Sequence, residues 1–393
     1  MKVMCNRDCV KLGVSSDLHF LSKKLYDNGK AFRDMYYHSD GKQIKNGEKL
    51  IDQVLLEVQQ QQLDAILLTG DLTLNGELKS HEELVEKLKI VKKSGIPIFV
   101  VPGNHDIGHP NAKGYRKEET YQVQTIREEE FLDLYEEFGY AQAISKDAYS
   151  LSYAVPFSKR IWLICLDNCC RLNGKPLQYG QMKEESLEWL EEKLQEARSW
   201  NAYPLVMGHY NLALHNRIFQ DHFTMRNHEK VGRILKKYQV PVFLSGHMHM
   251  QHMERQNGIL DIATSSPCTY PHQYGILTVT DGKHVIYQTR QVIMSRNERC
   301  NYRRFYYNNF MRQVMDELEM ASQIPGVIKI EMAAYAARMN LYYFSGSFYK
   351  IQDEVKNAHG WKLWQQYGES FYFYTYLKSI LDDSMKNHNI YVQ

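Results

Sequence analysis

Val100-Val101-Pro102-Gly103-Asn104-His105-Asp106 is the stretch that decides the fold we expect for this chain. An apolar run, a proline and a glycine are followed at once by three side chains that can bind metals or carry protons. Four more clusters have the same form, each a short apolar run that ends in polar side chains: Asp17-Leu18-His19, Gly70-Asp71, Gly208-His209 and Gly246-His247-Met248-His249. Open α/β sheets bind ligands at the carboxyl ends of their strands, so the five clusters predict one shared site.

Strand-like and helix-like segments alternate around these clusters. Continuous apolar runs predict strands at 10–16, 65–69 and 97–101, and apolar residues at helical spacing predict helices over 47–62 and 77–94. This alternation is typical of an α/β fold in which helices cover the sheet. Further strands are expected at 161–167, 204–207, 241–245 and within 258–292.

The texture of the sequence changes near residue 295, and the segments beyond it are helical in pattern and rich in Tyr, Phe, Met and Trp. We therefore predict a catalytic domain over residues 1–294 and a small all-α domain over 295–393, whose last helix covers 371–385. Large aromatic residues at helical spacing favour packing of this domain over a stacking platform for nucleic acid. Oligomerisation through the helical domain is an open alternative.

The composition is that of a soluble globular protein, with 393 residues, 44% hydrophobic and 24% charged. A formal net charge of +2 does not favour nucleic acid as the partner. Seven cysteines without the spacing of a disulfide scaffold indicate reduced thiols, and no apolar run approaches the roughly 18 residues of a membrane span. We expect a cytoplasmic protein, with export by a leader missing from this chain as the alternative.

The polar clusters offer ligands for metal ions. Side chains two apart at a strand end point to one side, so Asp17 pairs with His19 and His247 pairs with His249. Asp71, Asn104 and His209 add one ligand each, and imidazole and carboxylate groups suit Zn, Mn or Fe. Four imidazoles and two carboxylates are too many for one ion, so we expect two ions with one bridging carboxylate.

In these five blocks the sequence resembles the calcineurin-like metallophosphoesterase superfamily over residues 10–290, and the stretch 70–77 resembles bacterial members grouped with cyclic-nucleotide phosphodiesterases. The resemblance implies a sandwich of two mixed β-sheets flanked by helices. It also implies one ion held by Asp17, His19 and His249, a second held by Asn104, His209 and His247, and Asp71 as the bridge. The ions implied are pairs drawn from Mn, Fe and Zn.

The resemblance further implies a reaction. A hydroxide between the two ions attacks a phosphodiester in line, and His105 donates a proton to the leaving oxygen. Asp106 is expected to orient the imidazole of His105, with a turn or helix cap as the equal alternative. Phe20, Tyr210 and Asn211 are expected to contact substrate, and a packed Phe20 is the equal alternative.

The expected substrates are cyclic nucleotides or similar small phosphodiesters. Leu74-Asn75-Gly76 stands where the related protein phosphatases carry Asp-Arg-Gly, which speaks against a protein phosphatase. A nuclease, a phosphomonoesterase and a nucleotide pyrophosphatase are alternatives with the same two-metal chemistry. A non-catalytic scaffold is a third hypothesis, and the complete set of seven ligand positions speaks against it.

Overall fold

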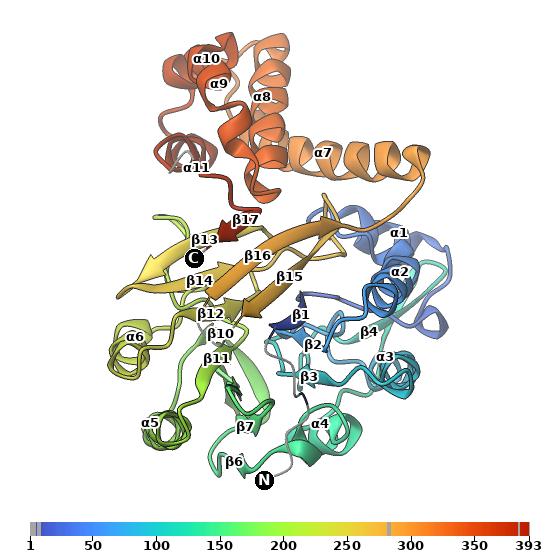
Figure 1. Ribbon diagram of the computed structural model, residues 1–393. Coiled ribbons are helices and arrows are strands. Elements are labelled where there is room, and N and C mark those ends of the chain that lie inside the picture. The colour runs from blue at the N-terminus through green and yellow to red at the C-terminus, as the bar shows by residue number, and fades with distance from the viewer. Residues whose placement is uncertain (1–4, 6–8, 281–283, 384–385, 393) are drawn as a thin grey trace.

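The computed structural model describes residues 5, 9–280, 284–383 and 386–392. Two mixed β-sheets face each other between layers of helices, and a helical region stands beyond one edge of the sandwich (Figure 1). This arrangement confirms the predicted fold class.

The first sheet has the strand order β17-β16-β15-β1-β2-β3. Its parallel half pairs Leu12 with Ala65 and Leu68 with Val100, so three of the polar clusters emerge at the same edge. Its antiparallel half contains the two strands that precede the C-terminal helices and one strand that follows them. The strands are β1 Cys9–Ser15, β2 Ala65–Leu68, β3 Ile98–Val100, β15 Gln273–Thr280, β16 His284–Gln291 and β17 Ile390–Val392.

The second sheet has the order β13-β14-β12-β11-β8-β7-β6. Its central strands β8, β11, β12 and β14 run parallel, and its outer strands are antiparallel. The strands are β6 Ser145–Lys146, β7 Tyr153–Pro156, β8 Ile161–Cys165, β11 Tyr203–Met207, β12 Val242–Ser245, β13 His252–Gln256 and β14 Ile259–Ala263. Two hairpins lie apart from it: β4 Lys113–Arg116 with β5 Glu119–Gln122, and β9 Cys169–Leu172 with β10 Lys175–Gly180.

Strand β8 shows how the layers form, because its side chains alternate between two cores. Leu163 and Cys165 pack in the large core that also contains strands of the first sheet. Ile164 packs in a separate core with Leu187 and Leu190 of the overlying helix. Helices α2 Gly47–Gln60, α3 Leu78–Lys93 and α4 Glu128–Tyr135 flank the first sheet, and α5 Glu184–Ser199 and α6 His228–Lys237 flank the second (Figure 1).

The C-terminal helical region covers 296–381 and has its own apolar core, which includes Met332, Met339 and Trp364. It begins at a capping box in which Ser295 Oγ accepts from the Glu298 amide. Its helices are α7 Arg296–Glu319, α8 Gly326–Phe344, α9 Gln352–Asn357, α10 His359–Tyr367 and α11 Tyr372–Leu381. Short helices lie at α1 Lys30–Tyr37 and, as 3-10 turns, at Lys23–Leu25, Ile44–Asn46, Tyr140–Gln142 and Phe348–Lys350.

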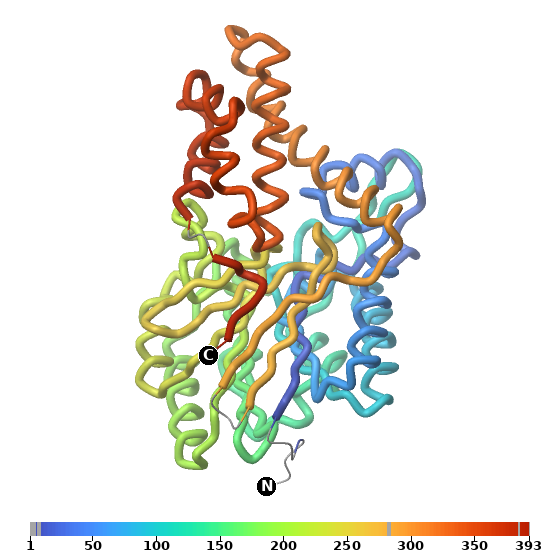
Figure 2. The backbone as a smooth tube through the Cα atoms, turned by 45° about the horizontal axis from the view of Figure 1, so that its top comes forward, coloured from blue at the N-terminus to red at the C-terminus, as the bar shows by residue number. Residues whose placement is uncertain are grey.

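The region projects from the sandwich (Figure 2), and α7 and β17 are two of the elements that tie it there. Helix α7 lies along α1, where Phe305 stacks on Tyr36 with ring centroids 4.4 Å apart and Asn309 donates to the Tyr37 carbonyl. After α11 the chain returns as β17, which pairs with β16. The expectation that everything beyond 295 is helical is wrong for these three residues, and residues 384 and 385 of the last expected helix lie outside the described residues. The division of the chain into a domain over 1–294 and a second domain over 295–393 stays a prediction.

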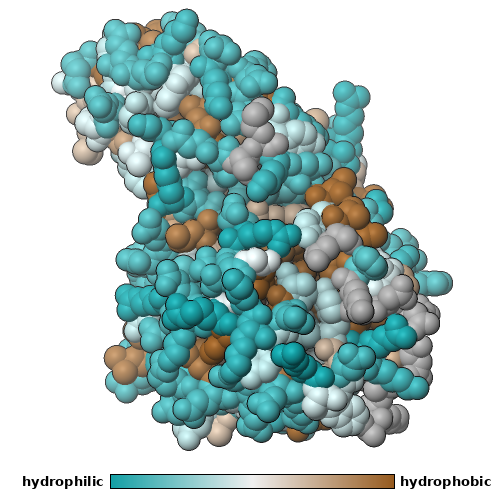
Figure 3. All heavy atoms as spheres, turned by 60° about the vertical axis from the view of Figure 1, so that its left-hand side comes forward, coloured by the Kyte–Doolittle hydropathy of each residue, from teal (hydrophilic) through white to brown (hydrophobic). Residues whose placement is uncertain are grey.

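In the part of the chain that the structure describes, no helix is both long enough and apolar enough to cross a membrane. The face drawn in Figure 3 is mainly hydrophilic, with hydrophobic side chains in small separate patches. The apolar residues are therefore used mainly in the cores between layers.

We expect Leu163→Ala to lower the free energy of unfolding by about 3 kcal/mol, because Leu163 is buried between the sheets and truncation leaves a cavity. Urea titration followed by circular dichroism measures the change. Ile90→Ala, at an exposed position of α3, is the control and should change the free energy by less than about 0.5 kcal/mol. Equal losses in the two variants would contradict the assignment of Leu163 to the core.

Candidate metal centre

The polar residues at the strand ends have unusual backbone geometry. Five of the seven predicted ligands have positive φ angles between 43° and 69°: Asp17, His19, Asp71, His247 and His249. The left-handed region costs a residue other than glycine about 1–2 kcal/mol. Such strain persists only where the surrounding structure imposes it, and it concentrates at functional sites.

Two glycines of the motifs are required by close approach of the loops. A Cβ atom on Gly103 would lie 2.1 Å from Asp71 Oδ1, and one on Gly246 would lie 1.7 Å from Ser16 Oγ. Both contacts are far shorter than van der Waals distance. The glycines therefore let loops from both sheets meet at one point.

The first group of donors contains Asp17, His19, Asp71 and His249, all with one ligand atom within 4.8 Å of the others. His19 Nε2 lies 2.8 Å from His249 Nε2 and 3.8 Å from Asp71 Oδ2. His249 Nε2 lies 3.4 Å from Asp17 Oδ1. Both sheets contribute to this group.

The second group contains Asp71, His209 and His247, so Asp71 belongs to both groups. His209 Nε2 lies 3.4 Å from Asp71 Oδ1 and 3.1 Å from His247 Nδ1. Asn104 Oδ1 lies 2.9 Å from the same His209 nitrogen. The structure therefore brings all seven predicted ligands together, with Asp71 between the two groups as expected of a bridge.

Hydrogen bonds outside the second group fix which nitrogens face inward. His209 Nδ1 lies 2.9 Å from the Thr69 carbonyl, and His247 Nε2 lies 2.7 Å from the His222 carbonyl. A carbonyl only accepts, so each of these nitrogens carries a hydrogen. The nitrogens left for a metal ion are His209 Nε2 and His247 Nδ1, which face each other beside the Asp71 carboxylate. Against burial, the Asp71 carboxylate raises the pKa of His209 to about 9, so a metal ion at Nε2 would replace a proton.

The electrostatics of the two carboxylates fit the same interpretation. Burial favours the protonated form of Asp71, but His209, His105 and His19 outweigh it and hold the pKa well below its usual range. Burial acts likewise on Asp17, and the nearby His249 overcomes it and lowers the pKa. Both groups are therefore carboxylates at neutral pH, as metal ligands must be.

His105 lies beside these groups. Its ring is oriented by Leu74 and Asn75, which belong to the stretch Leu74-Asn75-Gly76 that differs from the protein phosphatases. Its Nδ1 is 2.8 Å from the Leu74 carbonyl and 3.0 Å from Asn75 Oδ1. The ring of His109 stacks on it with centroids 4.7 Å apart. Asn75 is thus a site residue that the sequence analysis did not assign, although it noted the substituted position.

The expectation that Asp106 orients the imidazole of His105 by a hydrogen bond is wrong. The carboxylate of Asp106 instead accepts from the amides of Leu72, Thr73 and Gly103 at 2.8–3.1 Å, and from the Thr73 hydroxyl. It is fully buried and ties the loop after β2 to the loop after β3. The alternative of a turn cap describes its position.

Two of the three expected substrate contacts are also corrected. Phe20 is 1% exposed and packs in the large core, because its backbone pairs with Thr73 and turns the ring inward. Asn211 is fully buried, where its amide donates to Ser245 Oγ and the Gly246 carbonyl. Tyr210 does line a cavity, with its ring 4.2 Å from that of His247.

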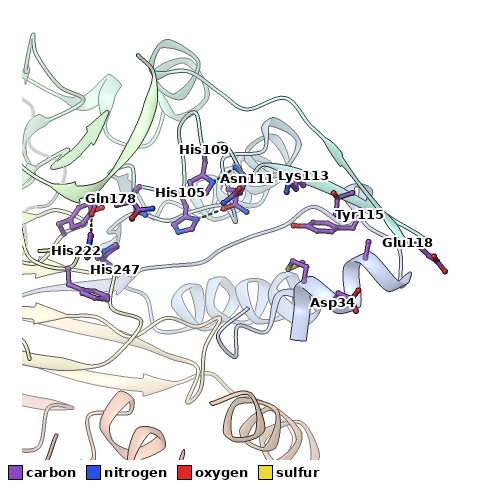
Figure 4. Close-up of a pocket in the computed structure, with 17 residues that line it drawn as sticks. Asp34, His105, His109, Asn111, Lys113, Tyr115, Glu118, Gln178, His222 and His247 are labelled. Atoms are coloured by element: carbon purple, nitrogen blue, oxygen red, sulfur yellow. Dashed lines mark hydrogen bonds between the residues drawn. The ribbon is translucent and has the colours of Figure 1, made fainter. Parts of the chain in front are cut away.

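This cavity has a volume of about 810 Å³ and opens beside the second donor group. His105 and His109 lie on one side of it, His222 and His247 at one end, and Tyr115 and Asp34 toward the other end (Figure 4). Helix α1 and the β4–β5 hairpin therefore form a wall opposite the candidate centre. The cavity is large enough for a small-molecule ligand.

A carboxylate shared by two ion-sized donor groups at the strand ends of an α/β sandwich is typical of two-metal hydrolases, among them the phosphoester hydrolases. Residues 10–251 match the family model described as calcineurin-like phosphoesterase, and the chain belongs to this family. Residues 300–387 match a model described as the C-terminal domain of cyclic nucleotide phosphodiesterase. The protein is a metal-dependent phosphoric ester hydrolase, which excludes the non-catalytic scaffold, and enzymes of this family use a dimetal centre.

Named relatives agree with this membership. The 3′,5′-cyclic adenosine monophosphate phosphodiesterase CpdA of Haemophilus influenzae is 28% identical over 226 residues, 57% of this chain and 69% of the relative. The probable glycerophosphodiester phosphodiesterase GpdQ of Arcobacter nitrofigilis is 29% identical over 229 residues, 56% of this chain and 68% of the relative. A dimetal phosphatase structure from Danio rerio shares the fold, with a TM-score of 0.53 and 13% identity over 72% of this chain and 96% of that one.

Glu77 gives a prediction on pH dependence. Burial raises the pKa of this carboxyl to about 7 from 4.5, against the amide of Asn75, which donates to it. The folded protein thus holds this proton more tightly than the unfolded chain does. Stability contributed by Glu77 is therefore lost as pH rises from about 4.5 to 7, by at most about 3 kcal/mol.

We expect Glu77→Gln to remove this loss, so that the variant gains stability over the wild type at pH 8 but not at pH 4.5. Urea unfolding of both proteins at the two pH values measures the difference. Glu82→Gln, at a partly exposed position of helix α3, which Glu77 precedes, should follow the wild type at both values. A Glu77→Gln protein that loses as much stability as the wild type on going to pH 8 would contradict the prediction.

Proposed function

We propose that the protein is a dimetal phosphodiesterase that hydrolyses small phosphodiesters, with cyclic nucleotides as the first candidates. The observation that carries the proposal is that two donor groups share Asp71 beside a cavity of about 810 Å³. A cavity of this size accommodates a nucleotide-sized molecule. One relative is named for a cyclic nucleotide as its substrate, and the other is named as a probable phosphodiesterase of glycerophosphodiesters.

In this proposal Asp17, His19 and His249 hold one ion, and Asn104, His209 and His247 hold the other. Asp71 lies between them because its two oxygens face different groups: Oδ2 faces His19 and Oδ1 faces His209. When bound, the ions lower the pKa of water and stabilise charge on phosphoryl oxygens. The donor set suits Mn, Fe or Zn.

His105 acts as the proton donor to the leaving oxygen. The Leu74 carbonyl accepts from Nδ1, so Nε2 is the nitrogen that can serve a substrate in the cavity. Burial lowers the pKa of this imidazole, against the attraction of the Asp71 carboxylate. The ring donates only while it is protonated, which the Asp71 carboxylate favours and burial opposes, so the contribution of His105 should be largest at low pH.

A panel of substrates tests the proposal. Protein loaded with Mn²⁺ is assayed on an aryl phosphodiester, the matching monoester, 3′,5′- and 2′,3′-cyclic nucleotides and single-stranded DNA. We expect turnover of the aryl phosphodiester and of at least one cyclic nucleotide, well above turnover of the monoester. Turnover of the monoester alone, or preference for DNA, would contradict the proposal in favour of a phosphomonoesterase or a nuclease.

We expect His105→Ala to lower kcat on cyclic nucleotides by about 10²–10⁴-fold, because their alkoxide leaving group needs a proton. The rate on an aryl phosphodiester with a nitrophenol leaving group should change little, since nitrophenolate leaves without needing a proton. The variant should keep its metal content, measured by mass spectrometry, whereas Asp71→Ala should lose metal and all activity. Loss of a metal ion in His105→Ala would show that His105 is a ligand instead of the proton donor.

A further inference from the structure

Four titratable side chains form a line from the catalytic sheets to the C-terminal helical region: Asp261, His215, His252 and Asp383. His215 Nε2 lies 3.2 Å from Asp261 Oδ2, and His215 Nδ1 lies 3.0 Å from His252 Nδ1. His252 Nε2 lies 2.9 Å from Asp383 Oδ2. We call these four residues the relay, and all of them lie outside the lining of the 810 Å³ cavity.

The inner end of the relay holds the loops that carry two proposed metal ligands. Asp261, on β14 and fully buried, accepts through Oδ2 from the amides of Leu212 and Ala213 at 2.6 and 2.8 Å. Its Oδ1 accepts from Ser245 Oγ at 2.7 Å. Leu212 and Ala213 follow His209 closely, and Ser245 directly precedes the Gly246-His247 turn. One carboxylate therefore fixes both loops.

The outer end belongs to the C-terminal helical region and the segment after it. Asp383, just beyond α11, accepts from Tyr343 Oη of α8 at 2.8 Å as well as from His252. The backbone on both sides of His252 is held from the same region. The Gln251 amide donates to the Phe344 carbonyl, and the Met253 amide donates to His388 Nδ1.

The relay is polar and largely buried along its length. The Asp383 carboxylate only accepts, so His252 Nε2 carries a hydrogen and donates to it, and burial lowers the pKa of His252 against the pull of Asp383. His215 is buried, with Nδ1 facing His252 and Nε2 3.2 Å from the Asp261 carboxylate. Removal of one partner leaves a buried polar group without compensation.

We infer that the relay positions the metal centre from the C-terminal helical region, with Asp261, His215, His252 and Asp383 as positioning residues for the ligands His209 and His247. The inference rests on the proposed function, because it takes these histidines as ligands. Residues hydrogen-bonded directly to metal ligands typically contribute 10–100-fold to metal affinity, and the relay, which acts through the loops that carry the ligands, is expected at the low end of that range. The helical region is then a part of the hydrolase whose docking sets the geometry of its site.

Metal binding tests the inference without turnover. Metal-free full-length protein is titrated with Mn²⁺ by calorimetry, for the wild type and for Asp383→Asn, which keeps the shape and an acceptor but removes the charge. We expect the affinity for the more weakly held ion to fall about tenfold. Where activity on the aryl phosphodiester is measured, kcat should fall with KM nearly unchanged.

Glu354→Gln is the matched control. It removes a carboxylate from the same helical region by breaking the exposed Arg338–Glu354 ion pair, whose N–O distances are 2.6 and 2.7 Å, and it should leave Mn²⁺ affinity unchanged. Tyr343→Phe removes one hydrogen bond to Asp383 and should give a smaller loss in the same direction, which keeps the test open if Asp383→Asn does not fold. His252→Gln should reproduce the loss seen in Asp383→Asn.

Folded relay variants that bind two Mn²⁺ ions with wild-type affinity would overturn the inference and leave the relay a purely structural link. The proposed function fails by a different result: a wild type that binds two Mn²⁺ ions and hydrolyses no phosphodiester. The two failures are therefore distinguishable.

Discussion

The buried carboxylate of Asp71 is the constraint on which the rest of the site depends. Its two oxygens face the two donor groups, and its Oδ1 also accepts from the His105 amide at 2.9 Å. Its own carbonyl accepts from the His19 amide. Burial alone would neutralise this group, and the imidazoles around it keep it charged. We propose that this negative charge at the meeting point of both sheets draws cations there. Close approach at Gly103 and Gly246 and the left-handed conformation of the expected ligands bring the other donors within reach of it.

That convergence costs folding free energy. Five left-handed residues at about 1–2 kcal/mol each amount to roughly 5–10 kcal/mol, comparable with the whole net stability of a typical protein. The continuous core between the sheets offsets this free energy. Hydrogen bonds such as those of Asp106, which join the loops after β2 and β3, also contribute. Ions that bind only the folded chain add stability by mass action. The metal centre and the fold therefore support each other, and the strained loops are where metal binding and stability are coupled.

The sequence predicted much of this because the donors follow strands, and the strand ends of the two facing sheets meet at one edge of the sandwich. All seven expected ligands lie together for that reason. Prediction from the sequence failed where the direction of a side chain depends on tertiary packing. Asn104, His105 and Asp106 are consecutive, yet the turn sends Asp106 away from His105 into a pocket of amides. Strand β17 is three residues long and pairs with a strand about a hundred residues earlier, so no local pattern could reveal it.

The charges around the cavity bear on the kind of ester that fits. Among the described residues that line it, Lys113 is the one Lys or Arg, and Asp34 and Glu118 are the two carboxylates. Asn75 occupies the place where the related protein phosphatases have an arginine for the phosphate, and here it orients His105. A phosphomonoester carries close to two negative charges at neutral pH and needs such cations, whereas a diester carries one. Little fixed positive charge comes from side chains, which supports the proposal that bound ions would carry most of the phosphoryl charge and that the substrate is a singly charged diester.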